Sequence, residues 1–594
     1  MITMMKKNIF VTIAAMALAV SAMHAQDLDP TVVVNRAYEG RLTDVHKPLL
    51  DMQVPDSVTR FDLDFDYSVF DKPYKGAYEF NPYLLTMQPA SSIQDPKQLY
   101  LRVGAGYTLH PTLDLVWAVP TKGAFKVDAY ALHRSYVGQY RKFRPELVEG
   151  ETVMIERMKL HGGDRTNRQV YYDLETRAGV DGSYDWKAGS VTFDASYYGL
   201  ASEDYLKSRH YDALDIKAGI ASKRLGEDHF MYDVDLKYRF GADAMNYAGA
   251  VDRLDEHVFS VKATLGQVMT KAFRTHKVLF DAGLDLAAYS HSVYSTIAGQ
   301  FYITPRYVYD YSKWKVDAGI KLAKVMRSES PNGIFSAKEQ IVYPDVYASF
   351  DAVPQYLRIY TEIGGGNKMN TYSSLLKENH HFDAQFGRDM WPLMDFSVER
   401  VSATMGFKGR FSKLTYDLRG GYVNYANALM DAIVVAEPFA NNTTEYLPGF
   451  GYAGYQKAFA AISLDWKSEA LLLDTELQYD YSFGFSGSDG LFAPAAFTGQ
   501  AIVEYNWSRR IYAGVDCIFA TARKGSVLDV RQSVKAYDAE IPGYADLGLY
   551  FEYAFSNSFS LWARGGNLLD MTIQRNPLYA EKGVNFTVGI CLNL

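Results

Sequence analysis

The sequence is poor in cysteine, in excess basic charge and in long apolar runs. Of its 594 residues only Cys517 and Cys591 are cysteines, which excludes a disulfide framework and a four-thiolate zinc site. Lys and Arg total 61 against 69 Asp and Glu, a net charge of −8. The basic footprint of a nucleic-acid-binding protein is therefore absent, and no nucleic acid is expected as a partner. Beyond the N-terminus no stretch approaches about 18 consecutive apolar residues, so no transmembrane helix is predicted.

The N-terminus has the charged and apolar regions of an export signal. Lys6 and Lys7 form a positive region, and the mostly apolar segment 9–22 follows. This segment is too short to span a bilayer as a helix, which needs about 20 residues. We therefore predict a signal peptide at 1–25 and a mature chain that begins near Gln26. The protein is expected to leave the cytoplasm.

The rest of the chain alternates between apolar and polar residues. In the segment 232–240 every second residue is apolar and the residues between them are charged, Lys237 and Arg239 among them. Successive side chains of a strand point to opposite faces, so such a segment forms a wall with one apolar and one charged side. Segments of about 9 to 13 residues suit a tilted strand that crosses a bilayer. The pattern recurs at 278–286, 314–322, 462–467, 474–481 and 545–553.

Connections between these segments are of two sizes that alternate. Short ones are predicted at 226–227, 311–312, 412–413, 468–469, 508–509 and 556–557, and long ones at 137–166, 241–254, 326–340, 366–397, 427–454, 524–542 and 570–582. Short periplasmic turns and long outer loops are typical of outer-membrane barrels. A sheet in lipid must also close, because it cannot leave an edge of unpaired backbone groups. We predict an all-β fold, a closed antiparallel transmembrane β-barrel of about 22 strands at 97–594, with both chain ends in the periplasm.

The C-terminal strands resemble those of a known family. Gly566-Asn567-Leu568-Leu569-Asp570, then Lys582-Gly583 and the closing strand with Phe586, Val588 and Gly589, resemble the C-terminal end of TonB-dependent receptors. The resemblance implies a 22-stranded outer-membrane barrel that takes up solutes with energy delivered by TonB. In this chain the segment before the barrel, 26–96, is shorter than the family's plug domain, so a full plug is not expected.

The segment 26–96 contains two further strand-like stretches and is expected to be periplasmic or luminal. Asp29 is followed after Pro30 by Thr31, Val32, Val33 and Val34, which resembles the stretch that the family offers to TonB. Binding by strand addition suits these β-branched residues, and an ordinary linker is the alternative. Phe61–Val69 alternates apolar residues with three aspartates, and it is a luminal strand, a strand that pairs with a periplasmic partner, or an additional wall strand. The lumen of so wide a barrel needs an occluding element, which is this segment, an inward-folded loop or a separate lid subunit.

Candidate sites of chemistry are few. Glu378, His380, His381 and Asp383 crowd one long loop, but ordinary loop polarity explains them better than a metal site. The run 486–490 has one carboxylate and is expected to be a flexible turn rather than a calcium loop. The glycines 364–366 lack the Lys-Ser or Lys-Thr step of a phosphate loop and are expected at a strand end. No catalytic constellation is singled out, so we expect no enzyme and no cofactor.

Two functions follow from this fold. The first is passage or uptake of a solute across the outer membrane. The alternative is a structural or assembly component of an outer-membrane complex, whose lumen is filled by a partner.

Overall fold

The structure is a computed structural model. It describes residues 97–107, 109–121, 123–138, 143–148, 151–156, 171–203, 207–223, 228–247, 250–271, 274–291, 295–327, 340–382, 394–439, 443–529 and 535–594. The predicted signal peptide 1–25 and the segment 26–96, with Phe61–Val69, lie outside these residues. The barrel is confirmed within them, and no described helix is long and apolar enough to cross a membrane.

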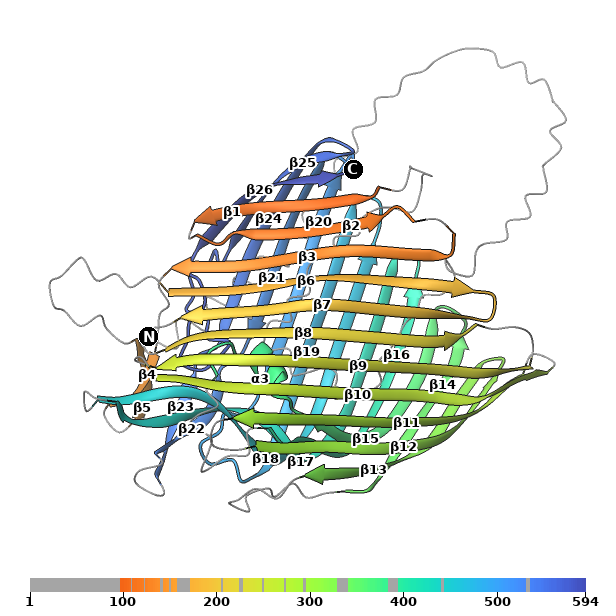
Figure 1. Cartoon of the computed structure of the whole chain (residues 1–594), viewed down its shortest axis with the longest axis horizontal. Coiled ribbons are helices and arrows are strands. Elements are labelled where there is room, and N and C mark those ends of the chain that lie inside the picture. Colours follow the sequence, from red (N-terminus) through yellow and green to blue (C-terminus); the bar gives the residue numbers. More distant parts are fainter. Residues whose placement is uncertain are drawn as a thin grey trace, which may run out of the picture. The chain divides into compact units, whose positions relative to one another are not determined.

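Twenty-two antiparallel strands form the wall (Figure 1). They are β1 Leu99–Tyr107, β2 Thr112–Val119, β3 Phe125–Gly138, β6 Tyr171–Trp186, β7 Gly189–Glu203, β8 Lys207–Ser222, β9 Asp228–Tyr247, β10 Ala250–Lys271, β11 Arg274–His291, β12 Ser295–Tyr311, β13 Trp314–Arg327, β14 Val342–Val353, β15 Leu357–Met369, β16 Phe396–Phe411, β17 Leu414–Phe439, β18 Thr443–Lys467, β19 Leu471–Ser486, β20 Phe497–Trp507, β21 Ile511–Ala520, β24 Tyr544–Ser556, β25 Phe559–Gly566 and β26 Asn585–Asn593.

The sheet closes between its first and last strands. β1 and β26 pair antiparallel from Tyr100 opposite Asn593 to Tyr107 opposite Phe586. Each other wall strand pairs with its neighbours in chain order, and β21 pairs directly with β24. No edge is left to lipid, as the absence of water in a bilayer requires. The predicted strand number and closure are therefore confirmed.

The two faces of the wall differ as the alternation predicts. On β9, Leu236 and Phe240 lie on the outer face, 37% and 36% exposed. Arg239, of the opposite parity, forms an ion pair with Asp215 on β8 at 2.5 Å. Arg306 on β12 likewise pairs with Asp281 and Asp317. An apolar outer face is what lipid requires, and the charged face lines the lumen.

Short turns occupy one end of the barrel, here named the turn end. The chain turns after Tyr311, Phe411 and Trp507, with Ser312, Ser412 and Ser508 at φ of 57°, 55° and 53°. The turns at 468–470 and 557–558 are also as predicted, and the turn at 226–227 lies outside the described residues. The first and last wall strands begin and end at this turn end, so the predicted even topology holds.

Several predicted loops at the other end, the loop end, are wrong. Most of 241–254 is strand, because β9 reaches Tyr247 and β10 starts at Ala250. Most of 427–454 belongs to β17 and β18. The pairing of these two strands extends as far as Phe439 opposite Thr443. Strands this long continue past the bilayer, and the sequence pattern weakens where no lipid faces them. The glycines 364–366 form a bulge inside β15, with Gly366 at φ 155°, rather than the strand end expected.

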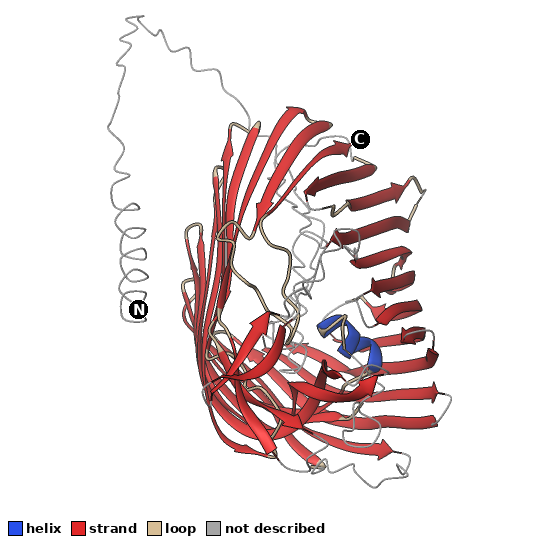
Figure 2. Cartoon of the chain, turned by 90° about the vertical axis from the view of Figure 1, so that its left-hand side faces the viewer, coloured by secondary structure: helices blue, strands red, loops and turns tan. Residues whose placement is uncertain are grey.

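Among the described residues, two hairpins and one helix lie at this loop end. The hairpins are β4 Phe143–Val148 with β5 Glu151–Glu156, and β22 Arg523–Asp529 with β23 Lys535–Ile541. The helix α3, Tyr372–Glu378, follows β15. The sequence predicts that the loop 366–397 lies outside the barrel. Its residues 370–382, here named the inner loop, instead fold back against the inner face of the wall (Figure 2).

Candidate functional site: an inner loop docked in the lumen

The inner loop is built around the short helix α3. Thr371 is its N-cap, with extended backbone and a side-chain oxygen that accepts a hydrogen bond from the Ser374 N–H at 3.2 Å. Lys377 lies in the last turn, where a cation suits the negative end of the helix dipole. A helix of two turns is not stable alone. Its stability must therefore come from packing against the barrel.

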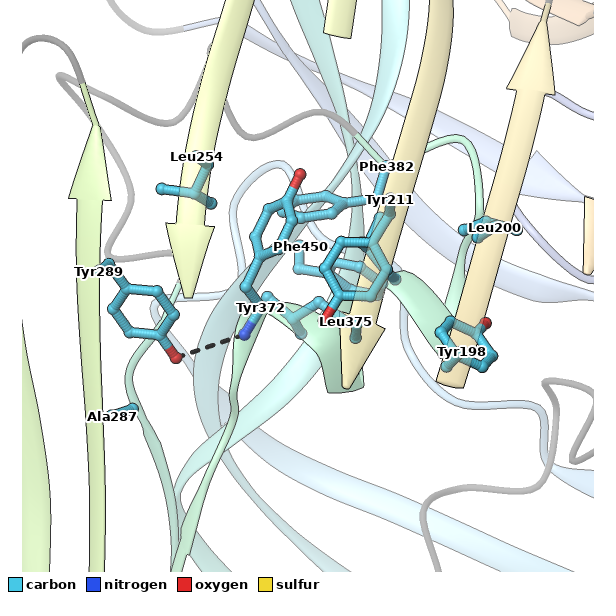
Figure 3. Close-up of a cluster of buried hydrophobic side chains, with 12 residues drawn as sticks. Tyr198, Leu200, Tyr211, Leu254, Ala287, Tyr289, Tyr372, Leu375, Phe382 and Phe450 are labelled. Carbon is cyan, nitrogen blue, oxygen red and sulfur yellow. Dashed lines mark hydrogen bonds between the residues drawn. The ribbon is translucent and has the colours of Figure 1, made fainter. Parts of the chain in front are cut away.

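The packing is an apolar cluster on the inner face of the wall (Figure 3). Tyr372, Leu375, Leu376 and Phe382 are at most 1% exposed. They contact side chains of β7, β8, β10, β11 and β18, namely Tyr198, Leu200, Tyr211, Ala213, Leu254, Ala287, Tyr289 and Phe450. Full burial of each large side chain stabilises the docked loop by about 1.5 to 3 kcal/mol.

A buried carboxylate holds the start of the helix. Glu256 on β10 is 0% exposed. One of its oxygens accepts a hydrogen bond from the Ser373 N–H at 3.1 Å, and the other accepts one from the Tyr211 hydroxyl at 3.1 Å. The first N–H groups of a helix have no partner within it, and the helix dipole favours an anion there. Glu256 therefore fixes where the helix begins on the wall.

A second buried network holds the end of the loop. Arg209 on β8 pairs with Asp243 on β9 at 3.1 Å, with both side chains at most 2% exposed. Asp243 also accepts a hydrogen bond from the Tyr372 hydroxyl, and Arg209 donates to the carbonyl of His380 at 2.8 Å. Lys207 donates to the carbonyl of His381 at 2.7 Å. Wall and loop thus share one charge network, which is costly to break from either side.

Two histidines complete the docking. His380 Nδ1 lies 3.1 Å from the Asp173 carboxylate on β6, and its side chain is one-fifth exposed. Burial alone would lower the pKa of His380, but the ion pair with Asp173 outweighs it and raises the pKa to about 9. The ring of His381 stacks on Tyr579, with centroids 3.9 Å apart and planes at 9°. The inner loop therefore contacts both the wall and the connection after β25.

That connection, 567–584 (the C-terminal loop), is itself tightly anchored at the loop end. Asn567, at φ 46°, accepts a hydrogen bond from the Met571 N–H and donates to the carbonyls of Met571 and Lys582. Arg575 pairs with Asp546 at 2.8 Å and with Glu581 at 2.6 Å. The family motif Gly566–Asp570 thus ends β25 as predicted and starts a buried loop. Tyr579 is 4% exposed within it.

Two of the candidate metal ligands, His380 and His381, contact different parts of the barrel. His380 pairs with the wall, His381 stacks on the C-terminal loop, and Asp383 lies outside the described residues. Within the described part of the chain no three His, Cys, Asp or Glu side chains are grouped to hold a metal ion. The run 486–490 is a turn with Gly487 and Gly490 at φ 70° and 80°, and it leads into the buried Leu491 and Phe492. Asp29 and Thr31–Val34 are also outside the described residues.

The wall residues that receive the inner loop are not among the residues predicted from the sequence. A signal for them was present: Tyr198, Leu200, Tyr211 and Ala213 are apolar, although the same alternate positions carry charge further along both strands, at Asp194 and Lys217. In a wall strand that faces lipid on one side and water on the other, every second residue is polar. Apolar residues at these inward-facing positions near the loop end indicate that the inner face is covered there.

Sequence comparisons give no relatives, whereas comparisons of structure give many. No protein-family model and no curated protein matches the chain. The solved copper transporter OprC matches with a TM-score of 0.56 at 9% identity, over 85% of this chain and 82% of that chain. The FrpB iron transporter from Neisseria meningitidis matches with a TM-score of 0.58 at 8% identity, over 84% and 82%. P. aeruginosa FpvA, bound to heterologous pyoverdines, matches with a TM-score of 0.58 at 8% identity, over 84% and 72%.

At such identities the likeness concerns the fold. The closed wall, its apolar outer face and these neighbours place the protein in the bacterial outer membrane. The chain has the 22-strand barrel fold of TonB-dependent outer-membrane receptors.

Proposed function

We propose that the protein takes up a solute across the outer membrane through the barrel lumen, with the inner loop as a displaceable constriction. The observation that carries the proposal is that the wall holds α3 through its side chains, without backbone pairing between the helix and a wall strand. The inner loop adds no strand to the wall, so it can leave without breaking the barrel. Two of the solved neighbours are named as transporters, of copper and of iron, which supports solute passage in general.

A loop-trimmed variant tests this proposal. Residues 371–394 are replaced by Asn-Gly, which joins β15 to β16 by a short turn. Unboiled protein should still migrate differently from boiled protein on a denaturing gel, because the closed wall remains. Conductance in a planar bilayer should rise several-fold over that of the unaltered chain. Unchanged conductance of the folded variant would show that the inner loop is not the constriction.

Purification of the unaltered protein from native membranes distinguishes the two candidate functions. If the protein purified from native membranes carries a stoichiometric partner that blocks conductance, the structural alternative is favoured. If it purifies alone and a solute permeates liposomes that contain it, uptake is favoured.

We also propose that Asp29 and Thr31–Val34 bind TonB in the periplasm. Support comes from the acidic residue and the β-branched run after it, which suit strand addition. Deleting 29–34 should abolish capture of TonB and leave the heat-modifiable barrel intact. Equal capture by the deleted and the full chain would leave 29–34 as a linker.

A further inference from the structure

A hollow on the inner wall lies apart from the docked loop. It is a cavity of about 330 Å³ formed by strands β3, β6, β7, β8 and β9. Its floor is Gly219 on β8, whose lack of a side chain leaves the space open. A Cβ at this position would lie 2.6 Å from Thr192 Oγ1 and 2.9 Å from Asp235 Oδ1. The volume is at the lower limit for pockets that hold small molecules.

Charges in this hollow are arranged by strand register. Asp128, Asp181 and Asp194 are direct cross-strand neighbours on β3, β6 and β7. The same row continues with Lys217 on β8 and Lys237 on β9. Three carboxylates therefore stand side by side and two ammonium groups follow them. Like charges directly opposite in a sheet are destabilising, so this row calls for a compensating group.

Internal pairing satisfies only part of the row. Lys217 lies 3.4 Å from Asp194, which also accepts a hydrogen bond from the Tyr130 hydroxyl at 3.2 Å. Among the described residues, neither Asp181 nor Lys237 has an ion-pair partner within 4.0 Å. In the adjacent row, Lys126 offsets part of the negative charge of the three aspartates, and Asp235 offsets part of the positive charge of the two lysines. Neither reverses the sign of the charge on its side. One side of the hollow stays negative and the other stays positive.

We propose that this hollow is a binding subsite for a small zwitterionic solute, of the class of a short peptide with free termini. The ammonium group would face Asp181 and its acidic neighbours, and the carboxylate would face Lys237. Neighbouring strands are about 4.8 Å apart, so β6 and β9 are separated by about 14 Å. An extended tripeptide is about 10 Å long, and the inward-reaching side chains span the remainder.

Binding to the purified full chain in detergent tests the subsite. The probe is trialanine at pH 7, measured by equilibrium dialysis, with N-acetyl-trialanine and trialanine amide as blocked forms. The unblocked peptide should bind at least about tenfold more tightly than either blocked form, which is about 1.4 kcal/mol. No binding, or equal binding of all three peptides, overturns the proposal.

Variants locate the binding. Asp181→Asn and Lys237→Met should each weaken trialanine binding about tenfold. Asp474→Asn is the matched control, because Asp474 on β19 also stands opposite a second carboxylate, Asp465, but outside the hollow. Gly219→Val should fill the floor and abolish binding while the sample stays heat-modifiable. Equal weakening by the control, or full binding by the Gly219 variant, places the peptide elsewhere and overturns the proposal.

The subsite proposal rests on the proposed uptake function, but separate experiments test the two proposals. Dialysis measures binding with no transport step, and conductance of the loop-trimmed variant needs no peptide.

Discussion

The inner face of β7 to β9 carries two different surfaces along the same strands. Near the loop end it is apolar and completely covered, with Leu200 2% and Tyr211 1% exposed under the inner loop. Four to six residues further along β7 and β8, Asp194 and Lys217 line an open hollow. One surface is specialised for holding a part of this chain, and the other is free to meet a solute. The lumen is thus divided by chemistry rather than by a change of fold.

The largest effect is expected where the covered surface contains charge. Arg209→Met leaves Asp243 buried without its cation, which costs about 3 to 5 kcal/mol. The inner loop should undock, so that trypsin cuts after Lys377 far faster than in the unaltered chain. The double variant Arg209→Met with Asp243→Asn removes both charges and should recover much of the protection. Rapid cleavage in the double variant as well would show that the charge network is not what holds the loop.

A somewhat smaller effect is expected from the apolar contacts of the same surface. Leu375→Ala removes a side chain that is 0% exposed and should destabilise docking by about 2 to 5 kcal/mol. Raised conductance in a planar bilayer, together with faster cleavage after Lys377, is the expected result. Leu236→Ala on the lipid face of β9 is the control and should change neither. If both variants behave alike, the effect belongs to the barrel and not to the loop.

The two surfaces also mark how far the sequence could be interpreted. Alternation in 232–240 predicted the lipid face of β9 and its inward Arg239 correctly, because lipid and water act on every second residue. It could not predict Glu256 as an anchor for the helix. An inward-facing carboxylate fits the same alternation whether it contacts water or a helix N-terminus. Likewise, the loop 366–397 has no feature that distinguishes an outer loop from an inward one. That distinction depends on the shape of the distant strands that receive it.

Raising the pH should loosen the covered surface more gently. The pKa of His380 is raised from its usual 6.5 to about 9, so protonation favours the docked loop. This stabilisation is complete below about pH 6.5 and disappears as the pH rises through 9, with an upper limit of about 3 kcal/mol. Cleavage after Lys377 should therefore accelerate between pH 7 and 9.5. In Asp173→Asn, which removes the carboxylate partner, that acceleration should be largely absent; an unchanged pH profile would exclude this ion pair.

The smallest effect is expected at the contact between the two loops. Tyr579→Leu keeps an apolar side chain in the cluster of the C-terminal loop but removes the ring that stacks on His381. Such a stack is worth about 0.5 to 1.5 kcal/mol beyond its buried area. The cleavage rate after Lys377 should rise by a factor of about 2 to 12, and His381→Ala should add little in the double variant. Tyr479→Leu, at a lipid-facing tyrosine that is 51% exposed, is the control and should leave the rate unchanged. Additive effects of the Tyr579 and His381 substitutions would mean that the rings act separately, in which case the inner loop is held by the wall alone.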